Sequence, residues 1–479
     1  MTTNHVNSQT RSSGLRRLLS DYGMAVVLIL LCLLFSILTV SERHPTGVSA
    51  ARSLFEETDL SSMAAREVLI VIQASTEDSV FGHAVYMRLL AAGCDVEKPM
   101  SGTPEEIRTW LEGLAAAGRQ SDLIITSHAC FPVVESIRSQ MAGLSAIEVR
   151  EPPSYRWPTF LLAENLKNVA NQITVIAIIA IGMTMVIITA GIDLSVGSLI
   201  ALSAVVVAWL VGQMGGNQAT TGAMIVAVLG GTLLCGTIGA FSGLMVTRFS
   251  IPPFIATLAM MQVAAGLAYI VSQGRPIYQL PDNFIWLGRG VDPVLHVPNA
   301  VILMLVLYAV AHIVMTRTTF GRYVYAVGGN REAARLAGIR VNLVLFAVYA
   351  ICGLLAGLGG VVMASQLKSG APTYGLTYEL YVIAAVVVGG TSLMGGEGRI
   401  LGTLIGAFII AVIQNGMNLT NVESYTQKVI LGLVILAAVL VDRLKQTGFK
   451  AKIPKLNKDA QSERRTQVRL ADKGEGNAT

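Results

Sequence analysis

Residues 169–212 read VANQITVIAIIAIGMTMVIITAGIDLSVGSLIALSAVVVAWLVG, and this stretch decides the class of fold. It contains two apolar runs, each long enough to cross the roughly 30 Å hydrocarbon core of a bilayer as a helix. Gly191-Ile192-Asp193-Leu194-Ser195-Val196-Gly197 lies between the runs, and Asp193 is the only charged residue of the stretch. Such a pattern indicates a helical membrane protein with a polar break between two spans.

The same kind of run recurs along the chain. A first span is predicted at 23–40, and Arg11, Arg16 and Arg17 before it favour a cytoplasmic N-terminus. No A-x-A-like cleavage site follows, so we interpret the run as a span and not as a signal peptide. Nine further spans are predicted, at approximately 169–190, 195–212, 221–246, 253–272, 299–315, 342–363, 379–392, 400–418 and 426–441. The expected fold is an all-α polytopic membrane protein with about ten transmembrane helices.

Charge divides the chain into parts. The whole sequence is 53% apolar and 14% charged, against about 25% charged in soluble domains. Residues 42–158 hold 16 acidic and 10 basic residues, a net charge of −6, whereas 442–479 hold 5 acidic and 10 basic residues, a net charge of +5. The predicted parts are an N-terminus with the first span (1–41), a soluble extracytoplasmic insert (42–158), a core of nine helices (159–441) and a basic cytoplasmic tail (442–479).

Basic residues in short loops predict the orientation. Loops expected inside carry Arg248, Arg317, Arg322, Arg331, Arg335, Arg340 and Arg399. Loops expected outside carry few basic residues. This bias favours both termini in the cytoplasm and the insert on the outer side, in a cytoplasmic (inner) membrane.

The insert alternates between strand and helix patterns over 66–150. Apolar runs at 68–74, 122–127 and 146–149 predict strands, with a possible short strand at 94–97, and 82–92, 103–117 and 132–141 predict helices. Thr103 is a suitable N-cap, and Pro104 suits the first turn. The order predicts a small flavodoxin-like α/β domain with a parallel sheet. Cys94 and Cys130 could form a disulfide in an oxidising compartment.

The insert resembles one lobe of the sugar-binding proteins of periplasmic-binding-protein type I, in its strand–helix rhythm and in TPEEIRTWLEGLAAAGRQSDLIITS (103–127). A clamshell needs two lobes, and the insert has room for one. A docking platform or a remnant lobe is therefore favoured, and ligand capture by the insert is the alternative.

The sequence lacks the motifs that are typical of several kinds of catalytic site. The sequence has no Gly-Lys dipeptide and hence no Walker A loop, so ATP hydrolysis would come from a partner. It has no H-E-x-x-H, no C-x-x-C and no clustered His and carboxylate set at metal-ligand spacing. We therefore expect no catalytic residue, no cofactor, no metal and no nucleic-acid partner.

The loop 316–341 contains GGNREAARLAG, in which Asn330 can cap a short helix and Gly338 can end it. A short exposed helix with Arg and Glu suits docking into a groove of a cytoplasmic subunit. The alternative is a basic loop that serves only topology. The charge of this loop does not distinguish docking to a subunit from a purely topological role.

Long motifs then point to a family. IGMTMVIITAGIDLSVGSLIAL (181–202), TTFGRYVYAVGGNREAARLAGI (318–339), VVVGGTSLMGGEGRILGTLIGA (386–407) and QNGMNLTNVESYTQKVILGLVILAAVLVD (414–442) closely resemble the ribose/xylose/galactose-type permeases of ABC importers. The likeness covers 14–41 and 159–442. It does not cover the insert, because members of the family normally have a short external loop there.

The resemblance implies a permease subunit that carries a monosaccharide, with a cytoplasmic ATP-binding subunit, an extracytoplasmic sugar-binding protein and a permease homodimer or heterodimer. Glu332, Ala333, Ala334 and Gly338 match the family's coupling motif Glu-Ala-Ala-x-x-x-Gly. The expected coupling loop comprises Gly329, Asn330, Arg331, Glu332, Ala333, Ala334 and Gly338, and Glu332 is expected to support the loop or to pair with a basic residue of the ATPase.

The residues themselves suggest a second site. Gly191 and Gly197 can break the helix and free backbone groups to line a cavity, where Asp193 could accept hydrogen bonds from sugar hydroxyls. The favoured alternative is that Asp193 or Ser195 caps the next span at the cytoplasmic surface. The amides Gln414, Asn415 and Asn418 could line the path, or they could form hydrogen bonds between helices.

Two other functions remain open at this point. One is an ABC permease for another small solute, such as a branched-chain amino acid. The other is a membrane receptor that does not transport and uses the insert as a sensor.

Overall fold

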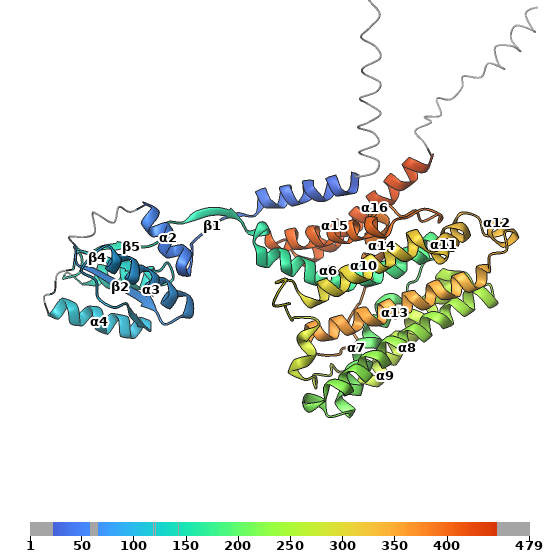
Figure 1. Ribbon diagram of the computed structural model, residues 1–479, viewed down its shortest axis with the longest axis horizontal. Helices are drawn as coiled ribbons and strands as arrows, with labels where there is room; N and C mark the ends of the chain where they lie inside the picture. The colour runs from blue at the N-terminus through green and yellow to red at the C-terminus, as the bar shows by residue number, and fades with distance from the viewer. Residues whose placement is uncertain (1–22, 58–65, 118, 120, 142, 448–479) are drawn as a thin grey trace, which may run out of the picture. The chain divides into compact units, whose positions relative to one another are not determined.

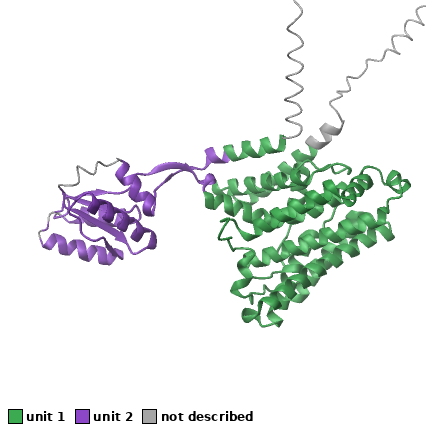
Figure 2. Ribbon diagram, viewed as in Figure 1, with its two compact units in different colours: residues 1–33, 163–479 green, residues 34–162 purple. Residues whose placement is uncertain are grey.

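The structure is a computed structural model that describes residues 23–57, 66–117, 119, 121–141 and 143–447. The chain forms two units (Figure 2): residues 34–162 are one, and residues 1–33 with 163–479 are the other. Arg11, Arg16 and Arg17, and most of the basic tail predicted at 442–479, lie outside the described residues.

The larger unit is helical (Figure 1). Part of helix Gly23–Leu38 belongs to this unit. The helices that follow in the unit are α6 (Ala163–Ile188), α7 (Val196–Gln213), α8 (Thr221–Arg248), α9 (Pro253–Ser272), α10 (Asn299–Arg317), α11 (Thr319–Gly329), α12 (Arg331–Leu336), α13 (Val341–Leu367), α14 (Tyr378–Val388), α15 (Ile400–Leu419) and α16 (Ser424–Thr447). Short 3-10 turns lie at Gly216–Gln218 and Asp282–Trp286.

Seven helices in the described part of the chain are long and apolar enough to cross a membrane: α6, α7, α8, α9, α10, α13 and α15. Three shorter apolar helices, Gly23–Leu38, Tyr378–Val388 and Ser424–Leu440, lie where the sequence predicts the remaining spans. The protein is therefore a mostly helical, polytopic membrane protein, and the number of ten spans stays a prediction.

Small residues allow α8 and α13 to lie close together. A Cβ added at Gly239 would lie 3.0 Å from Cα of Gly353, and one added at Gly357 would lie 2.9 Å from Cα of Thr232. Helices in lipid gain little from the hydrophobic effect, so close approach through small residues supplies the packing contacts. The glycine spacing of these two helices is explained by this contact.

The smaller unit is an α/β domain with a two-stranded ribbon. Its elements are β1 (Val40–Arg43), α2 (Gly47–Glu57), β2 (Val68–Gln73), α3 (Thr76–Ala91), β3 (Met100–Gly102), α4 (Pro104–Ala116), β4 (Leu123–Thr126), α5 (Phe131–Gln140), β5 (Glu148–Arg150), β6 (Tyr155–Pro158) and a 3-10 turn at Thr159–Leu161. Four strands form a parallel sheet in the order β3-β2-β4-β5.

Alternation along the strands divides the core of this domain into two layers. Val68, Ile70 and Ile72 pack with α2 and α3 on one face of the sheet, whereas Leu69 and Val71 pack with α4 and α5 on the other. Successive side chains of a strand point to opposite faces of the sheet. Because helices cover both faces, every position from Val68 to Ile72 is apolar.

Several local predictions for the insert can be compared with the structure. The strands at 68–74 and 122–127 and the helix at 103–117 are confirmed, and Thr103 forms a capping box with Glu106. The predicted helix 82–92 begins earlier, at Thr76, because Ser75 caps it by accepting a hydrogen bond from the Asp78 amide at 3.1 Å. The short strand expected at 94–97 lies instead at Met100–Gly102, and Val96 forms only an isolated bridge.

Cys94 and Cys130 are free and buried. Cys94 belongs to the layer of α2 and α3, and Cys130 to the layer of α4 and α5, so the sheet separates the two thiols. Burial raises the pKa of the Cys130 thiol, which keeps it protonated and unreactive near neutral pH. The possible disulfide does not form in this arrangement.

The chain enters and leaves the α/β domain through a ribbon that the sequence did not predict. β1 and β6 pair antiparallel, with Val40 opposite Pro158 and Arg43 opposite Tyr155. The Thr39 hydroxyl donates to the Phe35 carbonyl at 2.7 Å and accepts from the Phe160 amide at 3.1 Å. The entering and the leaving segments are thus fixed to one another.

Candidate functional site

The segment between α6 and α7 is not helical. Ala190 has a φ of +57°, which turns the chain, and the Gly191 amide donates to the Val186 carbonyl at 3.0 Å. A Cβ at Gly191 would overlap the Tyr349 hydroxyl, so this position requires glycine. The predicted helix break is present, and Tyr349 of α13 lies against it.

Asp193 is the central polar group of this segment. Its side chain is fully buried. Oδ1 accepts hydrogen bonds from the Ser195 amide at 2.9 Å and from the Ser195 hydroxyl at 2.6 Å. Oδ2 is buried without a hydrogen-bond partner, as is the hydroxyl of Tyr349. The Cys352 thiol of α13 lies beside the same carboxylate. Buried polar atoms are usually satisfied in folded proteins, so the two unpaired oxygen atoms make the segment a candidate site.

The local contacts of Asp193 agree with the favoured expectation of a cap. Asp193 turns the chain into α7 through its hydrogen bonds with Ser195, and its side chain is buried. Its position relative to the cytoplasmic surface stays a prediction.

Gly197 in the first turn of α7 marks a crossing with the segment before α14. A Cβ at Gly197 would overlap the carboxylate of Glu379 and would lie 2.7 Å from the Gly375 carbonyl oxygen. Gly375 has a φ of +68° and in turn lies against Ile200. α14 has 11 residues, which span about 16 Å, roughly half of the hydrocarbon core.

Two discontinuous helices therefore begin beside one another, with a carboxylate at their junction. Transporters often build their substrate sites where interrupted helices meet, because free backbone groups and helix N-termini face a cavity there. We call Asp193, Gly197, Tyr349, Gly375 and Glu379 the junction cluster. Sequence reasoning placed Glu379 only at a span end and missed Tyr349, since a lone Tyr in an apolar span gives no signal.

The end of α6 also meets the loop predicted for coupling. A Cβ at Gly328 would overlap the Ile188 carbonyl oxygen, and the Gly396 amide donates to that same carbonyl at 2.8 Å. The Arg331 guanidinium donates to the Thr189 carbonyl at 3.0 Å. Arg331 therefore attaches the loop to the segment that leads to Asp193.

α12 is capped at both ends. The Asn330 side chain accepts from the Ala333 amide at 3.0 Å, as predicted for an N-cap. At the other end Gly338 has a φ of +83°; its amide donates to the Arg335 carbonyl, and the Ile339 amide donates to the Ala334 carbonyl, both at 3.0 Å. This pair of bonds is a Schellman motif, which only glycine adopts without strain.

The outer face of α12 is exposed, and Figure 1 shows the helix at one end of the bundle. Glu332 and Arg335 pair at 2.9 Å with 71% of each side chain exposed. Leu336 is 87% exposed, whereas Ala334 is buried against the bundle. An apolar side chain beside an exposed ion pair is suited to contact with another protein. Leu336 is not among the coupling residues predicted above, although an apolar residue in a charged loop is a recognisable signal.

Replacing Asn330 by Ala is expected to loosen α12, because the first-turn amide of Ala333 loses its acceptor. The cost is about 1 kcal/mol, as for other N-caps. Hydrogen–deuterium exchange of the purified protein should show faster exchange at residues 333–336. Asn330→Asp keeps the acceptor and should exchange like the parent; equal rates in all three proteins would contradict the cap.

The three amides predicted for the path do not join the junction cluster. Asn415 forms a reciprocal amide pair with Asn165, at 2.9 and 3.0 Å. Asn418 accepts from the Gln427 amide at 2.9 Å, and Gln414 is half-buried. Asn165 and Thr189 lie at opposite ends of α6, roughly 36 Å apart at 1.5 Å per residue. Asn415 and Asn418 therefore form hydrogen bonds between helices, which is the second of the two possibilities given for them above.

Comparison with known proteins agrees with this architecture. Residues 165–439, which contain α7 to α15 and most of α6 and α16, match the family described as branched-chain amino acid transport system / permease component. The chain belongs to this permease family. The matched part leaves out the α/β domain.

Several relatives of this permease are named as sugar permeases. It is 46% identical over 293 residues to the ribose import permease protein of Escherichia coli strain K12, which covers 60% of this chain and 88% of the relative. It is 44% identical over 290 residues to the ribose import permease protein of Bacillus subtilis strain 168, with 60% and 87% covered. It is 36% identical to the D-allose transport system permease protein of Escherichia coli strain K12, with 60% and 85% covered. No solved structure matches the permease.

Proposed function

We propose that this chain is the membrane-spanning permease subunit of an ATP-binding-cassette importer that carries a monosaccharide across the inner membrane. The observation that carries the proposal is the 46% identity to a ribose import permease over 293 residues, which is 88% of that relative. Relatives named for D-allose and L-arabinose transport, each 36% identical, support the same substrate class. The chain is a transporter subunit and not an enzyme, and it acts with an ATP-binding subunit and a substrate-binding protein.

α12 is the part that receives the force of ATP hydrolysis. It is exposed at the end of the bundle, capped at both ends, and attached by Arg331 to the Thr189 carbonyl. A rigid, short helix can transmit a displacement of the ATP-binding subunit to the segment that holds Asp193. Movement of α12 then alters the junction cluster, which we assign to the sugar path. The coupling residues are those predicted from the sequence, 329–334 and Gly338.

The junction cluster suits a sugar because its two carboxylates and its phenol can form hydrogen bonds with hydroxyl groups. Asp193 Oδ2 and the Tyr349 hydroxyl are both buried without a partner. A monosaccharide carries hydroxyl groups that can donate to a carboxylate and accept from a phenol. Asn415 and Asn418 are assigned to contacts between helices. Ser195 is assigned the role of orienting the Asp193 carboxylate in the sugar path.

The orientation follows from the basic residues. Arg248 ends α8, and Gly243 of α8 lies against Phe346 near the start of α13, so Arg248 belongs to the same end of the bundle as Arg331 and Arg340. This end is proposed to face the cytoplasm, with both termini. The α/β domain then lies outside, where it serves as a docking platform for the sugar-binding protein. Two permease copies, identical or related, complete the path.

The second candidate is a permease for a branched-chain amino acid, favoured by the description of the matched family. Reconstitution with the ATP-binding subunit and the binding protein separates the two. ATP hydrolysis and uptake should rise with one monosaccharide of a panel that includes ribose, allose and arabinose. Leucine should have no effect.

Stimulation by leucine and by no sugar would replace the first proposal by the second. A complex that forms but hydrolyses no additional ATP with any solute would contradict both.

A further inference from the structure

The carboxyl ends of the central strands of the α/β domain form a crevice of about 590 Å³. The chain passes from β2 to β3 on one side and then to β4 on the other, so the direction of the connections reverses between β2 and β4. Open α/β sheets bind their ligands outside the strand ends at such a reversal. Residues after β2 and β4 line the crevice, together with Glu42 of β1 and His44, which directly follows β1. We call it the sheet-edge crevice.

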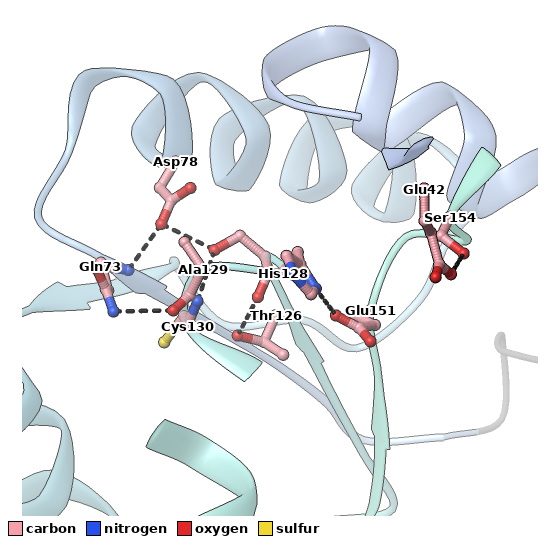
Figure 3. A network of polar contacts seen from close by, with 10 residues as sticks. Glu42, Gln73, Asp78, Thr126, His128, Ala129, Cys130, Glu151 and Ser154 are labelled. Atoms are coloured by element: carbon pink, nitrogen blue, oxygen red, sulfur yellow. Dashed lines mark hydrogen bonds and ion pairs between the residues drawn. The ribbon is translucent and has the colours of Figure 1, made fainter. Parts of the chain in front are cut away.

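The floor of the sheet-edge crevice is a fixed polar network (Figure 3). Asp78 is 8% exposed; its Oδ2 accepts from the Ser127 hydroxyl at 2.8 Å and from the Gln73 amide at 3.3 Å. The Ser127 hydroxyl oxygen accepts from the Cys130 amide at 3.3 Å. These bonds hold the loop after β4 and so place His128.

Three potential metal ligands from distant segments converge beside this network. His44 follows β1, His128 follows β4, and Glu151 follows β5; one ligand atom of each lies within 4.8 Å of the others. His128 Nδ1 lies 2.7 Å from Glu151 Oε2. The rings of His44 and His128 stack with centroids 3.2 Å apart and planes at 3°. Nδ1 of His44 is buried without a hydrogen-bond partner.

A purely structural role leaves this arrangement unexplained. If both imidazoles were protonated, two positive rings in contact would repel one another. If His44 is neutral, its Nδ1 stays excluded from water and unpaired, which proteins usually avoid. A divalent ion resolves both difficulties, because neutral imidazole nitrogens and a carboxylate oxygen are its ligands.

We propose that His44, His128 and Glu151 bind one divalent transition-metal ion, with Zn²⁺ as the best fit. Imidazole nitrogens favour Zn²⁺ and its first-row neighbours over Mg²⁺ or Ca²⁺. Three protein ligands leave one tetrahedral position free. His44 and His128 line the sheet-edge crevice, so this position faces the space where a ligand of the domain would lie.

Binding requires local rearrangement that the site can provide. The hydrogen bond between His128 and Glu151 breaks, and the stacked rings tilt apart so that both nitrogens point at the ion. Other charged groups face the site as well. Glu42 accepts a hydrogen bond from the Ser154 hydroxyl, and this bond, together with the charge of Arg156, keeps the pKa of the Glu42 carboxyl below its ordinary value. Glu42 therefore adds a negative charge that partly offsets Arg156.

Titration of the purified full-length chain with Co²⁺ tests the proposal, since bound Co²⁺ reports its ligands by absorption. The parent should bind one equivalent, with d–d bands and no thiolate charge-transfer band, and Zn²⁺ should displace it. His44→Ala and His128→Ala should abolish stoichiometric binding. Glu151→Gln should lower the affinity by about 10- to 100-fold, whether Glu151 ligates the ion directly or orients His128.

His83→Ala is the matched control, because His83 is exposed on α3 of the same domain and is not in the cluster. It should bind Co²⁺ like the parent. His44→Cys keeps a ligand at this position and should add a thiolate band to the spectrum, which a misfolded protein would not do. Unchanged binding in both alanine variants, or a His44→Cys protein that binds without the new band, would overturn the proposal.

Discussion

Glu332→Lys is expected to reduce sugar uptake by more than about tenfold while the protein still inserts into the membrane. Placing a like charge at a protein interface costs several kcal/mol, and each 1.4 kcal/mol is a factor of ten. Glu332 is exposed on α12, so the substitution leaves the bundle intact and acts on the docked ATP-binding subunit. Uptake into proteoliposomes and co-purification of the ATP-binding subunit measure the effect.

A double substitution distinguishes docking from helix stability. Glu332→Lys with Arg335→Glu restores an ion pair within α12 but inverts both charges. Pairs at this spacing contribute only about 0.2–0.5 kcal/mol to a helix, so the double variant should stay inactive. Full uptake by the double variant would show that Glu332 acts only within α12, and full uptake by Glu332→Lys would remove the coupling role altogether.

Gly197→Ala is expected to lower uptake about as strongly, through a different cause. The added methyl would overlap the Glu379 carboxylate and lie 2.7 Å from the Gly375 carbonyl oxygen. The carboxylate can rotate away, but the Gly375 backbone cannot, so the crossing of α7 with the segment before α14 must open. Overpacking of this kind costs about 1–3 kcal/mol. Uptake per amount of folded protein in the membrane is the measurement.

Gly266→Ala provides the control. Gly266 also lies in an apolar helix, α9, but a Cβ added there meets no atom within 4 Å. Its uptake should equal that of the parent. Glu379→Gln tests the same crossing without added bulk and should also impair uptake, because the proposed path loses a charge. If Gly197→Ala transports as well as Gly266→Ala, the junction cluster is not part of the path.

The helices could be predicted from the sequence because each apolar run must span a fixed thickness of hydrocarbon. The predicted 253–272 coincides with α9, and 400–418 differs from α15 by one residue. The cap at Asn330 and the stop at Gly338 were also predictable, since both are local properties of a few adjacent residues. Helix caps depend only on residues within about one helical turn, so they can be predicted from the sequence alone.

Contacts between distant segments could not be predicted in the same way. For Asp193 the sequence favours a cap and leaves a sugar-binding role as the other possibility, because the burial of Asp193 depends on where α13 and α14 pass. His44, His128 and Glu151 have no motif spacing, since the fold brings together three separate loops. The side-chain amide of Asn415 forms a hydrogen bond with Asn165, which is 250 residues away in the sequence. Each of these needs the tertiary arrangement.

The antiparallel ribbon of β1 and β6 makes the α/β domain a removable module. Neighbouring strands lie about 4.8 Å apart, so the two backbones at Arg43 and Tyr155, which pair with one another, could be joined by a two-residue turn. The shortened chain would carry a hairpin in place of a domain.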